Sequence, residues 1–101
     1  MTQQSEKLMA LVQTNRVGIL ELCDEYGVTN PRVFGSVVSG QAHDASDIDI
    51  IITDKERHSY FTLGRLASDL NDLLGTKVDL IIDDEVKPNI FAHMTKNMVS
   101  L

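Results

Sequence analysis

Several features are scarce or missing in this sequence of 101 residues, and each absence argues against a class of protein. Cys23 is the one cysteine, so no disulfide can form within the chain, and its place in an apolar helical pattern predicts burial. No run of about 20 apolar residues occurs, and no basic segment followed by an apolar run opens the chain. We therefore expect a soluble, cytoplasmic protein with no membrane partner.

Basic residues are also scarce, because nine Lys and Arg stand against 15 Asp and Glu, giving a formal net charge of -6. Proteins that bind nucleic acid draw much of their affinity from many Lys and Arg contacts to phosphates, so a nucleic-acid partner is not expected. A nucleotide chelated to a metal ion remains compatible with this charge. The length predicts a single domain over 1–101 with one core, and hence an active site that is shallow or shared with a partner.

The order of apolar patterns predicts an α/β fold in which helices cover a small three-stranded mixed sheet. No internal repeat, low-complexity segment or linker interrupts it. The expected elements are a helix over 5–26, a strand ending at Phe34, a short helix over 36–40, a strand over 47–53, a helix over 63–74, a strand over 78–82 and a last helix that begins at Pro88. The segment 54–59 is expected to be a charged, mobile loop. Four apolar residues of the last helix should pack inward: Ile90, Phe91, Met94 and Met98.

Two aspartates, Asp47 and Asp49, alternate with isoleucines in the strand over 47–53. Side chains two apart on a strand project from the same face, with Cα atoms roughly 6.5 to 7 Å apart. Two such carboxylates repel each other unless a cation neutralises them, and hard oxygen ligands suit Mg²⁺ or Mn²⁺. If the strand over 78–82 is a neighbour, Asp79 adds a third carboxylate. The alternative interpretation is that these acids are solvated at strand ends.

Gly35 and Ser36 lie at a predicted strand-to-helix turn, twelve residues before the first aspartate of the pair. Free backbone N–H groups and the helix dipole favour a phosphate at such a turn, and the glycine lets the backbone approach the anion closely. The Ser36 hydroxyl can donate a further hydrogen bond. A phosphate-binding turn beside a metal-binding group of carboxylates predicts a phosphoryl or nucleotidyl transfer site. In such a site two metal ions activate the attacking oxygen and stabilise the leaving oxygen.

Other polar residues have plainer interpretations. The three histidines lack the spacing of metal ligands and are expected in surface or structural roles: His43, His58 and His93. Lys55 and Arg57 could approach a triphosphate, or simply be solvated. The acidic run over 83–85 is expected to form a solvated turn that favours the N-terminus of the last helix.

These residues form the pattern G-S, ten residues, D-x-D, read here as GSVVSGQAHDASDID, with a third acid in KVDLII. The pattern resembles the minimal nucleotidyltransferase family of the DNA polymerase beta superfamily. By this resemblance, Asp47, Asp49 and Asp79 would bind two catalytic Mg²⁺ or Mn²⁺ ions, and Asp79 would help to deprotonate the acceptor. Gly35 and Ser36 would hold the triphosphate of ATP.

The resemblance also implies a partner. Members of this family commonly pair with a helical HEPN-domain ribonuclease as a toxin–antitoxin module, in which the nucleotidyltransferase is the antitoxin and transfers AMP from ATP to a tyrosine of the toxin. The sequence departs from the family pattern G-S-R-x-R-G, because Val37 and Ser39 replace both arginines. Arginine is a bidentate phosphate ligand that neither residue can replace. Two alternatives therefore stay open: an antitoxin that only binds its partner, and a nucleotidyltransferase subunit that acts on a small-molecule hydroxyl.

Overall fold

The computed structural model describes residues 2–35 and 47–101. Its helices are α1 (Gln3–Thr14), α2 (Arg16–Glu25), α4 (Tyr60–Leu74) and α5 (Pro88–Met94), with short 3₁₀ helices η1 (Asp83–Glu85) and η2 (Thr95–Asn97). Its strands are β1 (Thr29–Phe34), β2 (Ile48–Thr53), β3 (Val78–Ile82) and β4 (Val99–Ser100). The predicted α/β class is confirmed. The expected short helix over 36–40 lies outside the described residues.

The strands form one mixed sheet in the order β3-β2-β1-β4, in which β2 and β3 are parallel and the other pairs are antiparallel. The three predicted strands are present, but the predicted strand count was wrong because β4 is a fourth. A strand of two residues is too short to show an alternating pattern. It forms because it pairs with Arg32 and Val33 of β1, and the N–H of Leu101 extends the contact by donating to the carbonyl of Pro31 at 3.0 Å.

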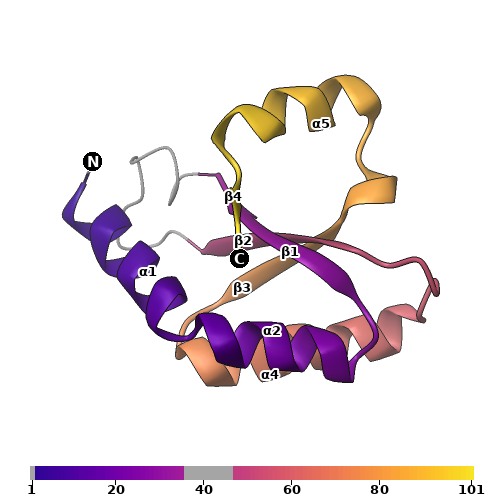
Figure 1. Cartoon of the computed structure of the whole chain (residues 1–101), viewed down its shortest axis with the longest axis horizontal. Coiled ribbons are helices and arrows are strands. Elements are labelled where there is room, and N and C mark those ends of the chain that lie inside the picture. The colour runs from indigo at the N-terminus through magenta and orange to yellow at the C-terminus, as the bar shows by residue number, and fades with distance from the viewer. Residues whose placement is uncertain (1, 36–46) are drawn as a thin grey trace.

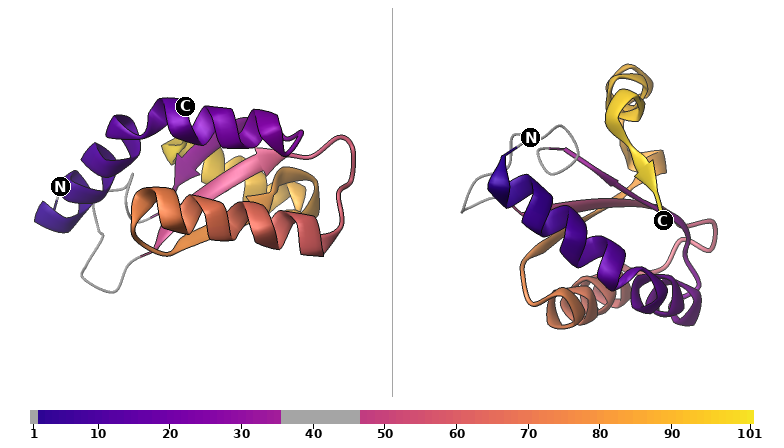
Figure 2. Two further views of the ribbon diagram at one scale, coloured as in Figure 1. Left: turned by 90° about the horizontal axis from the view of Figure 1, so that it is seen from below. Right: turned by 60° about the vertical axis from the view of Figure 1, so that its left-hand side comes forward.

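Helices α2 and α4 cover one face of the sheet, as Figures 1 and 2 show. Ile48, Ile50 and Ile52 of β2 point to this face and are fully buried. Four leucines of the helix predicted over 63–74 pack in the same core: Leu63, Leu66, Leu70 and Leu74. Cys23 is buried there too, and its burial raises the pKa of the thiol to about 11. Because side chains alternate along a strand, the odd-numbered residues of β2 face the other side of the sheet.

The predicted single helix over 5–26 is two helices, α1 and α2, separated at Asn15. The side chain of Asn15 donates to the carbonyl of Leu11 at 2.9 Å, and its backbone N–H is shared between the carbonyls of Leu11 and Val12. Asparagine side chains compete in this way with the helical hydrogen-bond ladder, which explains the break. No helix in the described part of the chain combines the length and the apolar character needed to cross a bilayer.

Helix α5 lies over the opposite face of the sheet from α2 and α4 (Figure 1). The prediction that its apolar residues pack inward was wrong for Ile90, which is 48% exposed, whereas Phe91 and Met94 are half-buried and no residue of the helix is fully buried. The face beneath it is partly polar. The ring of Phe91 lies over the guanidinium of Arg32, with 5.8 Å between Cζ and the ring centroid.

The charged segment over 54–59 is held by hydrogen bonds and ion pairs, so the expectation of a mobile loop was wrong. Asp54 is only 3% exposed and accepts a hydrogen bond from the backbone N–H of His58 at 2.8 Å. The ring of His58 lies between two carboxylates, with Nδ1 2.6 Å from Asp54 and Nε2 3.1 Å from Glu56. His58 therefore has the structural role that the sequence predicted for it.

Arg32 and Asp83 form a partly buried ion pair on the α5 side of the sheet, at 3.0 Å. The carboxylate also accepts a hydrogen bond from Thr53 at 2.5 Å. Burial alone would raise the pKa of Asp83, but the hydrogen bonds from Thr53 and Arg32 and the charge of Arg32 outweigh it and hold the pKa below its usual value. The expected solvated acidic turn is thus wrong for Asp83, whose side chain is a structural partner of β1 and β2.

Replacement of Arg32 with methionine should destabilise the protein by about 2 to 4 kcal/mol, because it leaves the Asp83 carboxylate largely buried without its partner. The second oxygen of Asp83 is buried and has no hydrogen-bond partner in the described part of the chain. Urea unfolding measures the loss. Arg65→Met, at an exposed position of α4, is the matched control and should change the free energy of unfolding by about 0.5 kcal/mol or less. Equal losses in the two variants would contradict a stabilising role for the pair.

Candidate active site

Two of the three predicted site acids lie side by side. Because β2 and β3 are parallel and in register, Asp49 is the direct neighbour of Asp79. Both lie on the face opposite the core formed by Ile48 and Ile50, and Asp47 directly precedes β2. The sequence predicted that the three acids would come together if these strands were neighbours, and the strands are neighbours.

The electrostatics around Asp49 are unfavourable for its ionised form. Burial, together with the negative charges of Asp79 and Asp47, raises the pKa of the Asp49 carboxyl to about 6. One cation lies close by, since Nζ of Lys77 is 3.5 Å from the carboxylate of Asp47. Lys77 was not predicted from the sequence as a partner of this group. Burial and two neighbouring negative charges disfavour the ionised form of this carboxyl, and a bound cation would stabilise it.

These acids do not form a complete metal-binding site by themselves. Within residues 2–35 and 47–101, no group of three or more His, Cys, Asp or Glu side chains is arranged to hold a metal ion. Mg²⁺ is usually bound in nucleotide sites by one or two carboxylates together with substrate phosphates and water, so a partial set of protein ligands fits this ion. Asp49 with one neighbour meets that requirement.

Gly35 lies against the carboxylate of Asp49. Phe34 is the cross-strand partner of Asp49, and Gly35 follows it at the end of β1 with a φ of +83°. A Cβ atom at this position would collide with Oδ2 of Asp49. The position therefore requires glycine for two reasons, the backbone conformation and the close carboxylate. Ser36, and also Val37, Ser39 and His43, lie outside the described residues.

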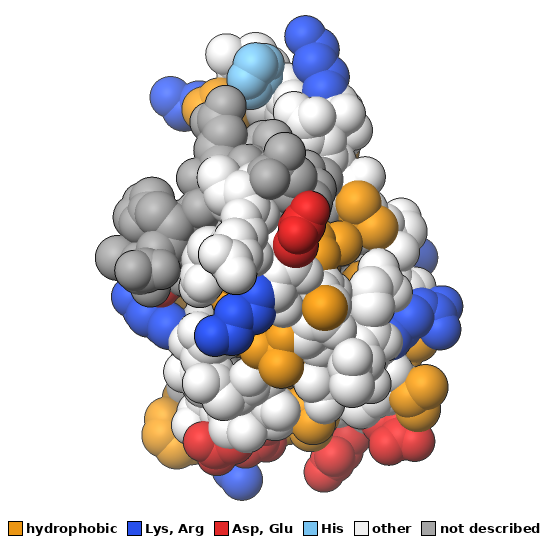
Figure 3. Space-filling view, turned by 90° about the vertical axis from the view of Figure 1, so that its left-hand side faces the viewer, with side chains coloured by type: hydrophobic (Ala, Val, Ile, Leu, Met, Phe, Trp, Pro, Cys, Tyr) orange, Lys and Arg blue, Asp and Glu red, His pale blue; other side chains and the backbone are white. Residues whose placement is uncertain are grey.

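A small pocket adjoins Gly35 on the α5 side. It has a volume of about 280 Å³ and is lined by Phe34, Gly35, His93, Met94 and Asn97. The sequence analysis assigned no site role to the residues contributed by α5 and η2. No local signal could have found them, because only the folding of the last helix over β1 brings them to Gly35. Figure 3 shows the end of the molecule that faces left in Figure 1, where the visible Lys and Arg side chains are scattered rather than gathered into a patch.

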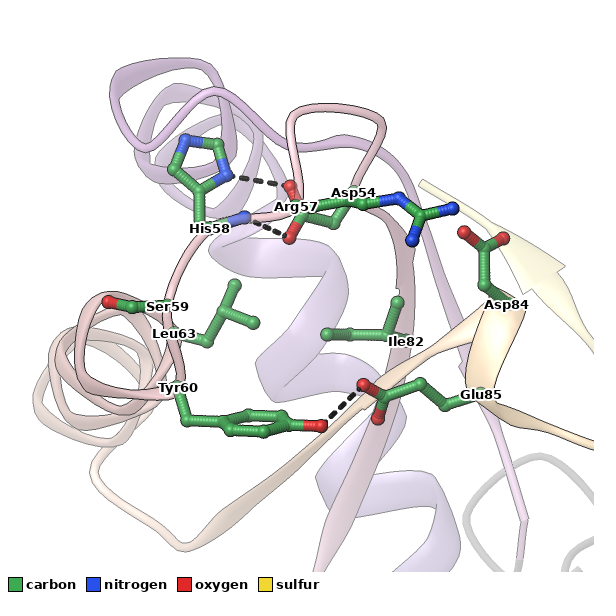
Figure 4. Close-up of a pocket in the computed structure, with 9 residues that line it drawn as sticks. All are labelled: Asp54, Arg57, His58, Ser59, Tyr60, Leu63, Ile82, Asp84 and Glu85. Carbon is green, nitrogen blue, oxygen red and sulfur yellow. Dashed lines mark hydrogen bonds and ion pairs between the residues drawn. The ribbon is translucent and has the colours of Figure 1, made fainter.

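Lys55 and Arg57 are not part of this site. They follow β2 at the end opposite to Asp47, and a strand of this length separates the two ends by roughly 20 Å. Arg57 lines a different pocket of about 450 Å³, where it points toward Asp84 while the hydroxyl of Tyr60 donates to Glu85 at 2.9 Å (Figure 4). The suggestion that these two cations approach a triphosphate near Gly35 was therefore wrong.

A sequence profile of the family described as "Polymerase beta, Nucleotidyltransferase" matches residues 19–101. The chain belongs to this nucleotidyltransferase family. The match covers all strands and the acids Asp47, Asp49 and Asp79. The predicted resemblance and the predicted enzyme class, a nucleotidyltransferase, are confirmed.

Relatives of this nucleotidyltransferase include the protein adenylyltransferase MntA of Thermococcus cleftensis, which is 35% identical over 79 residues, 78% of this chain and 80% of that protein. A solved structure assigned to a minimal nucleotidyltransferase superposes with a TM-score of 0.80 at 30% identity, over 93% of this chain and 95% of that chain. A complex of a tri-AMPylated Shewanella oneidensis HEPN toxin with its MNT antitoxin superposes with a TM-score of 0.67 at 20% identity. The last match covers 87% of this chain and 69% of that chain, and it shows a shared fold.

The raised pKa of Asp49 predicts how the stability of the nucleotidyltransferase depends on pH in EDTA. Its carboxyl has a pKa of about 6 in the folded chain against an ordinary value of 3.8, so the folded state binds more protons and stability falls as the pH rises through this window. Asp49→Asn removes this effect. The variant should melt a few degrees above the parent at about pH 7.5, with the difference vanishing near pH 4. A Tm difference that is the same at both pH values would contradict the assignment.

Proposed function

We propose that this chain is a Mg²⁺-dependent protein adenylyltransferase that transfers AMP from ATP to a tyrosine hydroxyl of a helical HEPN-type toxin, and that it acts as the antitoxin. The observation that carries the proposal is the contact of Gly35 with the Asp49 carboxylate, beside Asp79. It joins a phosphate-binding turn to a metal-binding strand pair. The names of the relative from Thermococcus cleftensis and of the Shewanella oneidensis complex support AMP as the transferred group and a HEPN toxin as the acceptor.

Each site residue has a role in this proposal. Asp47, Asp49 and Asp79 would hold Mg²⁺, which when bound would neutralise the phosphates and stabilise the leaving pyrophosphate. Gly35 offers its backbone to the triphosphate at a point where no side chain separates it from Asp49, and Ser36 adds a hydroxyl donor. Asp79 is exposed on β3, where an acceptor can reach it.

The proposed transfer is a single displacement at the α-phosphorus. The tyrosine hydroxyl gives its proton to the Asp79 carboxylate, and its oxygen forms a bond to the α-phosphorus of ATP. The bond between the α-phosphorus and the bridging oxygen breaks, and pyrophosphate leaves with that electron pair. The products are an AMP-tyrosine phosphodiester and pyrophosphate.

Labelled ATP tests the proposal directly. The chain is incubated with Mg²⁺, a HEPN-type toxin, and ATP carrying the label on either the α- or the γ-phosphate. The α-label should stay on the partner at a tyrosine, while the γ-label leaves with pyrophosphate. Transfer of the γ-label would indicate a kinase, and an unlabelled partner would overturn the enzymatic proposal.

A second candidate function is an antitoxin that neutralises its partner by binding alone. The observation that favours it is the replacement of both family arginines by Val37 and Ser39. In that case the toxin would be neutralised with no label on it, and the neutralisation would survive the double replacement Asp47→Asn/Asp49→Asn.

A further inference from the structure

We propose that the pocket between β1 and α5 binds the base of the nucleotide and that the side-chain amide of Asn97 selects adenine. The inference rests on the proposed function, because it assumes a nucleoside triphosphate at the carboxylates. It adds to that function a base-binding pocket and a residue that determines base specificity. The pocket is the one lined by Phe34, Gly35, His93, Met94 and Asn97.

The position of the pocket connects it to the reacting phosphate. Gly35 lines the pocket and also lies against the carboxylate of Asp49, so a single residue connects the pocket to this acid. Phe34 directly precedes Gly35 in β1 and is the cross-strand partner of Asp49. A nucleotide whose α-phosphate lies at Asp49 therefore has this pocket within reach of its sugar and base.

The size and charge of the pocket favour a base over the rest of the nucleotide. Sites for whole drug-sized ligands measure roughly 300 to 1,000 Å³, and this pocket of about 280 Å³ is smaller than that. In the described part of the chain it is lined by no Lys or Arg. A triphosphate would require such cations, whereas an uncharged aromatic base does not.

The side chains that line the pocket suit a flat base. The Phe34 ring and the Met94 thioether are apolar surfaces that can stack on or pack against an aromatic ring. Asn97 and His93 are exposed, and neither side chain has a hydrogen-bond partner among residues 2–35 and 47–101. Two polar side chains without a partner in the described part of the chain thus line an otherwise apolar pocket.

The amide of Asn97 offers one donor and one acceptor side by side. Adenine presents the complementary pair, an amino donor next to a ring nitrogen acceptor, and asparagine commonly binds it in this bidentate way. A tyrosine of a protein acceptor would present a single hydroxyl and leave half of the amide unpaired. The donor and acceptor pattern therefore favours adenine as the occupant.

Asn97→Asp tests the assignment with a nearly isosteric change. The aspartate can only accept, so it loses the bond to the adenine ring nitrogen and gains a match to guanine, which presents two adjacent N–H donors. Binding of ATP, GTP, CTP and UTP is measured by equilibrium dialysis with Mg²⁺ and no acceptor. Affinity for ATP should fall about tenfold relative to that for GTP. Asn89→Asp, the same change at an exposed position of α5 outside the pocket, should leave the ATP to GTP ratio unchanged.

The outcomes separate this inference from the proposed function. If the parent chain binds no triphosphate, the proposed function itself fails. If the parent binds ATP and the ratio of ATP to GTP affinity in Asn97→Asp equals that in Asn89→Asp, the base assignment is overturned while the proposed function stands. An Asn97→Asp variant with unchanged ATP binding but a raised KM for the protein acceptor would show that the pocket takes the acceptor, which also overturns the inference. Met94→Ala should lower the binding affinity for all four nucleotides by the same factor.

Discussion

Replacement of Asp49 with asparagine should abolish nucleotidyl transfer and at the same time make the metal-free protein more stable near neutral pH. Asp49 is partly buried beside Asp79 and Asp47, and this surrounding raises its pKa to about 6. The asparagine removes the unfavourable charge, which accounts for the gain in stability. It also removes a proposed ligand of Mg²⁺, an ion that when bound would supply several kcal/mol of transition-state stabilisation. That loss corresponds to a decrease in kcat/KM of about a thousandfold or more.

The two effects have opposite signs, which makes the experiment informative. Transfer of α-labelled AMP and the Tm in EDTA are measured on the same samples of the parent and the variant. Asp72→Asn, an equivalent change at an exposed position of α4, should alter neither quantity. Loss of transfer together with a lower Tm would show that Asp49 is a structural residue, and an active variant would remove it from the site.

The alternation of residues over 47–53 was the most informative part of the sequence. With a period of two, isoleucines at even positions and polar residues at 47, 49 and 53 require one apolar and one partly polar face of β2. The structure has Ile48, Ile50 and Ile52 in the core and Asp49 on the opposite face. From the residues alone, Asp79 joins this pair only on the condition that the strand over 78–82 is a neighbour. The parallel register of β2 and β3 makes it the direct partner of Asp49.

Features that depend on contacts between distant segments could not be predicted. Arg32 and Asp83 are 51 positions apart, and nothing in the local sequence around either residue indicates the ion pair. The wall of the pocket beside Gly35 has the same origin, since His93 and Asn97 reach β1 only through the fold of the C-terminal segment. The pairing of β4 with β1 is a further case, because its two residues carry no pattern of their own. Local propensity is a weak guide where tertiary contacts decide the structure.

Replacement of Gly35 with alanine should slow nucleotidyl transfer about a hundredfold with only a modest loss of stability. Gly35 has a φ of +83°, which an L-residue adopts at a cost of about 1 to 2 kcal/mol. The added Cβ would also collide with Oδ2 of Asp49, so the carboxylate or the backbone must move. A displacement of about 1 Å at a catalytic group can cost on the order of a hundredfold in rate. The rate of AMP transfer and the Tm are the two measurements.

Gly75→Ala separates the collision from the backbone strain. Gly75 caps α4 with a φ of +68°, close to the value at Gly35, but a Cβ there would meet no atom within 4 Å. Both variants should therefore lose about 1 to 2 kcal/mol of stability from the left-handed backbone, and Gly35→Ala loses somewhat more because the collision adds to the strain. Only Gly35→Ala should slow AMP transfer, because only at Gly35 does the new methyl group reach the Asp49 carboxylate. If the two variants lose activity equally, backbone strain alone explains the glycine, and the contact between the turn and the carboxylate has no catalytic importance.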